Sequence, residues 1–126
     1  GLASDWSTLY AADYSTGNIH EVDLSSGTLV MPPIASLDNP EGLAIDNEGR
    51  LLVVETGTSR LLRIDLANGN AITTLAEGLD LSQGGIPGAA PDTFFFDAVA
   101  VGPSGDIYVT GGGSNVIQKI KANKVR

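Results

Sequence analysis

The stretch Gly42-Leu43-Ala44-Ile45-Asp46 opens a unit that the chain repeats three times. Short apolar runs follow it at residues 51–55 and 61–65. The same succession of runs is found earlier and later in the chain, at 1–5, 9–13 and 19–23, and again at 98–102, 107–111 and 116–120. A repeat of this length is typical of stacked supersecondary units.

The middle unit predicts four strands, at residues 42–46, 50–55, 60–66 and 71–76. They are rich in Val, Ile and Leu and are separated by Gly, Asn, Asp and Ser, which is the chemistry of strands joined by tight turns. The first two strands are nearly continuous in apolar residues, as expected where both faces of a sheet are covered. No helical periodicity is present. Four antiparallel strands in about 40–45 residues predict an all-β fold made of β-propeller blades.

The repeat divides the chain into about three blades, half of a six-bladed propeller. We expect one half-propeller unit over residues 1–126: blade 1 at about 1–38, blade 2 at about 39–78, an inserted loop at about 79–95, and blade 3 at about 96–126 with its last strand missing. Closed propellers use typically about 4–8 blades. Three blades therefore leave an apolar sheet face uncovered at each end. A second copy of the chain, or the missing half of the propeller, is expected to complete the ring.

Composition excludes several classes of function. The 126 residues carry seven Lys and Arg against fifteen Asp and Glu, a net charge of −8, which disfavours binding to a nucleic-acid backbone. There is no cysteine, so disulfides, thiolate catalysis and cysteine zinc sites are excluded. No apolar run approaches the ~18–20 residues of a membrane span, so no membrane partner is expected.

Residues 39–55, from Asn39-Pro40-Glu41-Gly42 to Val53-Val54-Glu55, resemble the repeat of the SMP-30/gluconolactonase-like six-bladed propellers. They are also similar to NHL repeats and to ScyD/ScyE-like propellers. In the lactonase members, a divalent cation, usually calcium, sits at one mouth of the central channel. One of its ligands is the Asn of a Pro-Asn-Gly motif. Here Glu41 takes that position and Asp97 takes the corresponding position of the next blade, so the resemblance implies Glu41 and Asp97 as metal ligands.

Strand geometry gathers four carboxylates at one edge. In an antiparallel blade the first strand begins where the second one ends, which places Glu41, Asp97, Asp13 and Glu55 around one mouth of the channel. Calcium takes about six to eight oxygen ligands, which carboxylates supply. The alternatives are structural: Glu41 as a turn residue, Asp97 as a cap at the entry to a strand, and Asp13 and Glu55 as acceptors of backbone N–H bonds.

The inserted loop belongs to the same edge. A loop this long, rich in Gly and Pro, is uncommon unless it is functional or disordered. It ends in Phe94-Phe95-Phe96, which either anchors the loop in the core or forms an aromatic wall beside the channel mouth. With Glu41 and Asp97, Phe95 is a candidate ligand-binding residue. His20, the single histidine, is expected to have a half-buried packing role or an inter-blade role and not a catalytic one.

Two functions remain open, and no catalytic residue can be named. The preferred hypothesis is a binding and assembly module, whose channel mouth and inserted loop bind a small ligand or a partner. The alternative is a hydrolase of the lactonase or esterase type that depends on Ca²⁺ or another divalent cation. Gly111-Gly112-Gly113 is not followed by Lys and opens no helix, so it is not a phosphate loop, and no organic cofactor is expected. We expect an exported protein, secreted or periplasmic.

Overall fold

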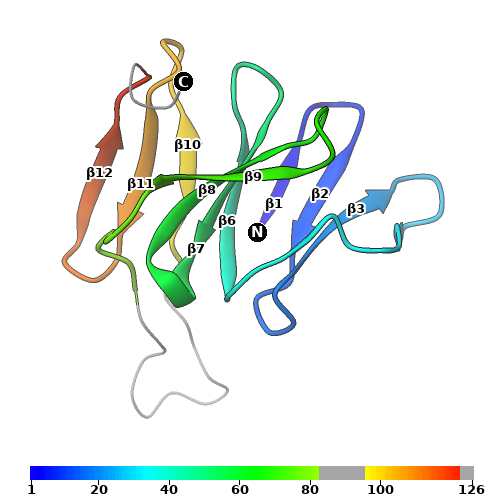
Figure 1. Cartoon of the computed structure of the whole chain (residues 1–126), viewed down its shortest axis with the longest axis horizontal. Helices are drawn as coiled ribbons and strands as arrows, with labels where there is room; N and C mark the ends of the chain where they lie inside the picture. Colours follow the sequence, from blue (N-terminus) through cyan, green and yellow to red (C-terminus); the bar gives the residue numbers. More distant parts are fainter. Residues whose placement is uncertain (83–95, 123–126) are drawn as a thin grey trace.

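The structure, a computed structural model, describes residues 1–82 and 96–122. Three antiparallel sheets stand side by side in chain order (Figure 1). The first contains β1 (Leu2–Ser4), β2 (Leu9–Ala12), β3 (Asn18–Asp23), β4 (Thr28–Leu29) and β5 (Ala35–Ser36). The second contains β6 (Pro40–Ile45), β7 (Leu51–Glu55), β8 (Arg60–Asp65) and β9 (Ala71–Ala76), with the short 3-10 turn η1 (Thr56–Thr58) after β7. The third contains β10 (Val99–Val101), β11 (Ile107–Gly111) and β12 (Val116–Ile120).

The all-β class and the antiparallel strand order are confirmed. The outer strand of the first sheet differs from that of the second, because it is split in two. β4 and β5 both pair with β3, at opposite ends of it. Pro32 and Pro33 lie between them, and proline has no backbone N–H to donate to a ladder. No helix in the described part of the chain is long and apolar enough to cross a membrane.

The strand registers give every sheet two equivalent faces. In the first two sheets, we call the face toward the next sheet in the chain the forward face and the opposite one the rear face. In the third sheet, the same names are given to the faces with the equivalent register positions. The forward faces carry Ala3, Tyr10, Ala12 and Ile19 in the first sheet, Ala44, Leu52, Val54 and Leu61 in the second, and Ala100, Tyr108, Thr110 and Ile117 in the third. The rear faces carry Leu2, Leu9, Ala11, His20 and Val22, then Leu43, Leu51, Val53, Leu62 and Ile64, then Val99, Ile107, Val109, Gln118 and Ile120.

Two cores form where a forward face meets a rear face. Tyr10 and Ile19 pack with the rear face of the second sheet, and Leu52 and Leu61 pack with that of the third. The second sheet is therefore covered on both sides, and all five residues of β7 are buried. The first and third sheets are each covered by a neighbouring sheet on one side. Burial of apolar surface, at about 25 cal/mol per Å², holds the sheets together.

Glycine at the start of the inner strands allows the sheets to approach. β6 contacts both β1 and β10. A Cβ atom on Gly42 would lie 2.7 Å from the carbonyl oxygen of Asp97, and one on Gly1 would lie 2.2 Å from that of Glu41. Both distances are below ordinary van der Waals contact, so these two positions accept only glycine at this spacing. The third sheet has Ala98 at the equivalent position.

Candidate functional site

The candidate site lies at the edge where the inner strands begin and the second strands end, the lower edge in Figure 1. Glu41 is the second residue of β6, and Asp97 stands two residues before β10. Glu55 ends β7, and Asp13 follows β2. The antiparallel geometry thus brings the predicted carboxylates to one edge, but only Glu41 and Asp97 touch each other.

Glu41 accepts a hydrogen bond from the neighbouring sheet. The backbone N–H of Asp97 donates to Glu41 Oε2 over 2.6 Å. Glu41 is 4% exposed. Burial raises the pKa of its carboxyl group, and the nearby charge of Asp97 adds to this effect, although the N–H bond from Asp97 acts in the opposite direction. Glu41 is therefore easier to protonate than an ordinary glutamate.

Asp97 makes the contacts of a cap at a strand entry. Its Oδ2 accepts the backbone N–H of Ser82 at 2.5 Å. Its Oδ1 accepts the backbone N–H of Gly112 at 2.9 Å and the hydroxyl of Thr110 at 3.2 Å. The side chain is buried, and both of its oxygens bind protein donors. Asp97 thus links Ser82, in the segment that follows β9, to Gly112, in the turn after β11.

A cavity of about 360 Å³ opens beside the two carboxylates. It is lined by Gly1, Glu41, Gly42, Phe96, Asp97 and Ala98. Phe96 is 66% exposed, so it does not anchor the inserted loop in the core and instead forms part of the cavity wall. Phe95, and the inserted loop beyond Ser82, lie outside the described residues.

The described residues do not build a calcium site from Glu41 and Asp97. Within residues 1–82 and 96–122, no group of three or more His, Cys, Asp or Glu side chains could hold a metal ion. The oxygens of Asp97 already accept protein hydrogen bonds. Calcium takes about six to eight oxygens, so a site here would need further ligands and a rearranged Asp97.

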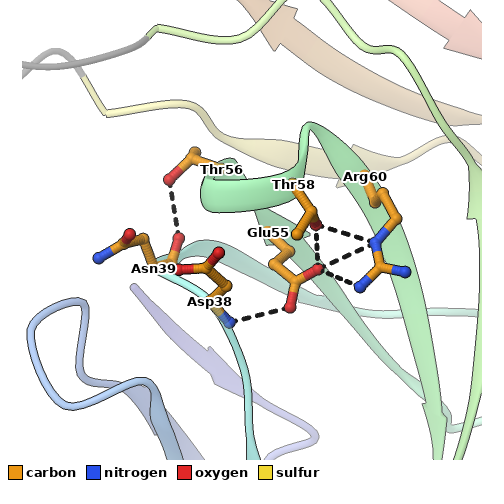
Figure 2. Close-up of polar contacts among 6 residues, drawn as sticks. All are labelled: Asp38, Asn39, Glu55, Thr56, Thr58 and Arg60. Carbon is orange, nitrogen blue, oxygen red and sulfur yellow. Dashed lines mark hydrogen bonds and ion pairs between the residues drawn. The ribbon is translucent and has the colours of Figure 1, made fainter.

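Glu55 is held in a separate cluster (Figure 2). Its Oε2 accepts the backbone N–H of Asp38 at 2.9 Å, and its Oε1 accepts from the Thr58 hydroxyl and pairs with Arg60 Nη2 at 2.7 Å. Burial alone would raise the pKa of Glu55, but these donors outweigh it and hold the pKa below its usual range. The contribution of Arg60 was not predicted, because no sequence signal separates it from an ordinary surface arginine.

Asp13 and His20 belong to the first sheet. Asp13 Oδ1 accepts the backbone N–H groups of Ser15 and Thr16, at 3.0 and 3.2 Å, as the structural interpretation predicted. His20 lies on the rear face and is 6% exposed, and its Nδ1 atom is buried without a hydrogen-bond partner among the described residues. Buried polar atoms without a partner are rare.

Comparison with known proteins identifies the fold. No family model matches the sequence, and no curated protein matches it. Among solved structures, a catalytically inactive H270A virginiamycin B lyase from Staphylococcus aureus with quinupristin has a TM-score of 0.65 and 18% identity over 98% of this chain. A streptogramin B lyase structure has a TM-score of 0.63 and 15% identity over 96% of this chain. The chain covers 38% and 39% of those two proteins.

These structures are β-propellers, a fold related to the SMP-30 and NHL-like propellers, and the sheets of this chain have the fold of propeller blades. At such low identity the likeness establishes the fold alone. It does not extend to the lactonase family, to the number of blades in the ring or to an activity.

Proposed function

We propose that this chain is a ligand-binding β-propeller module, whose site is the cavity at the inner-strand edge. Further blades, from a second copy or from the missing half of the propeller, complete its ring. The observation that carries the proposal is an apolar cavity lined by two buried carboxyl groups, those of Glu41 and Asp97, and by one exposed aromatic ring, that of Phe96. Small-molecule sites typically combine apolar walls with a few placed polar groups.

The chemistry of the cavity indicates a class of ligand. Phe96 offers a face for an apolar or aromatic group, and Glu41 offers an oxygen acceptor at the cavity wall. The chain carries a net charge of −8, which attracts cations. A small aromatic or apolar amine matches these features, because its ammonium group would favour the ionised form of Glu41.

The test uses 2-phenylethylamine as the probe and 2-phenylethanol as its neutral counterpart. Titration of either compound is followed by the amide resonances of Gly42, Asp97 and Ala98. We expect saturable shifts with the amine, weaker shifts with the alcohol, and loss of the difference in Glu41→Gln. Glu48→Gln is the matched control, because Glu48 is an exposed carboxylate in the turn at the opposite end of the inner strands. Shifts that do not saturate, or equal losses in the two variants, would contradict the proposal.

Metal-dependent hydrolysis stays the second candidate, favoured by the contact between Glu41 and Asp97. It requires ligands beyond those of the described residues. Millimolar Ca²⁺ should then raise the melting temperature of the wild type, since a ligand that binds only the folded state stabilises it. No shift, or the same shift in Glu41→Gln, would exclude these carboxylates as its ligands.

A further inference from the structure

The forward face of the third sheet repeats a face that the chain buries twice. Ala100, Tyr108, Thr110 and Ile117 hold the register positions of Ala3, Tyr10, Ala12 and Ile19. Tyr10 and Ile19 are 7% and 0% exposed against the second sheet, whereas Tyr108 and Ile117 are 36% and 73% exposed. The exposed face holds a shallow, mainly apolar hollow of about 190 Å³.

The rear face of the first sheet is the complementary half. Leu2, Leu9, Ala11 and Val22 hold positions that carry Leu43, Leu51, Val53 and Ile64 in the second sheet. Leu2 is 67% exposed. The chain therefore carries both halves of an interface of a kind that it already makes twice internally.

Charge complementarity favours a second copy of this chain as the occupant. Residues 1–38 contain five acidic residues and no Lys or Arg. Residues 96–126 contain four basic residues and two acidic ones. Lys119 stands on the open forward face, opposite Tyr108 in the ladder, and pairs with Asp106 of its own sheet at 2.8 Å. A head-to-tail contact would bring these opposite charges together.

We propose that two copies of this chain associate head to tail, with the forward face of the third sheet in each copy packed on the rear face of the first sheet in the other. Two such contacts close a ring of six sheets, within the usual size of propellers. In the first two sheets, Gly1 and Gly42 let the inner strand approach the backbone of the following sheet. The third sheet has Ala98 at this position, so we expect the sheets at each contact between copies to lie further apart at this edge, by about one methyl group. The inference rests on the ring completion in the proposed function, but not on a ligand in the cavity.

Solution mass tests the proposal. Light scattering at micromolar concentration should give twice the 13.0 kDa of one chain, and the dimer should weaken as salt increases. Ile117→Lys and Leu2→Lys change exposed side chains on the two faces, so each should give a folded monomer. An equimolar mixture should regain dimers, because the first variant keeps an intact rear face and the second an intact forward face. Ile72→Lys, at a 48% exposed isoleucine on β9, should leave the dimer unchanged.

Two outcomes would contradict the proposed dimer. A monomer at all concentrations, or a dimer lost in Ile117→Lys but kept in Leu2→Lys, would overturn the proposal. Either result leaves the amine titration at Gly42 and Asp97 unaffected, so the two failures are distinguishable.

Discussion

The first three strands of the second sheet and the three strands of the third sheet have the same order and register but different surroundings. Leu61 and Ile117 hold equivalent positions, yet Leu61 is fully buried and Ile117 is 73% exposed. Leu52 and Tyr108 differ in the same direction. Leu61 packs with the third sheet and is flanked by β9, whereas Ile117 lies on the last described strand of its sheet, on a face that no described sheet covers. The contribution of each position to the free energy of unfolding should therefore depend on how far neighbouring strands and sheets cover it.

The largest expected effect comes from truncating the buried member of such a pair. Leu61→Ala should lower the free energy of unfolding by about 2–5 kcal/mol, because it removes apolar contacts and leaves a cavity. Ile117→Ala should change it by less than about 0.5 kcal/mol, as expected for an exposed site. Urea unfolding of dilute, monomeric protein measures both. Equal losses would mean that the third sheet is covered as well as the second.

Glycine at the inner edge provides the next contrast. In Gly42→Ala the added methyl group would press on the backbone of Asp97 and Ala98, at 2.7 and 2.9 Å. Overpacking of this kind costs about 1–3 kcal/mol. The mirror change, Ala98→Gly, relieves no contact within the described chain and should cost about 0.5–1 kcal/mol through backbone entropy. If thermal unfolding shows Gly42→Ala to be neutral, the sheets do not approach as closely as described.

The second and third sheets also differ in charge at the end of the second strand, where the second sheet has Glu55 and the third has Gly111. Glu55→Gln should cost about 2 kcal/mol at neutral pH, since it weakens hydrogen bonds to a charged group. The folded pKa of Glu55 is lowered, so its contribution is present above the ordinary glutamate pKa and is lost as pH falls through the folded value. Unfolding measured across the acid range should show the two proteins converging, and a constant gap would contradict this assignment.

The sequence predicts the strands well because their signals are local. Alternating apolar residues and turn residues place β7, β8 and β9 within a residue or so of their observed bounds, and the blade count predicts open faces at both ends. The shared edge of Glu41 and Asp97 follows from antiparallel geometry. The partners of Asp97 could not be predicted, because Ser82 and Gly112 reach it from other segments of the fold. The exposure of Phe96 also depends on packing that no local pattern encodes.

The smallest expected effect has the opposite sign and concerns Glu41, whose equivalent in the third sheet, Asp97, has both oxygens bound to protein donors. The folded pKa of Glu41 is raised by burial, so its contribution to stability is fully present below the ordinary glutamate pKa and is lost as pH rises through the folded value. Glu41→Gln keeps an oxygen that can accept the N–H of Asp97 and carries no charge to bury. Without ligand, the variant should therefore be slightly more stable than the wild type at neutral pH, by less than the changes above, and the advantage should disappear in acid. Urea unfolding at a series of pH values measures the difference. A variant that is less stable at every pH would mean that the folded protein stabilises the ionised carboxylate of Glu41, as it does that of Glu55.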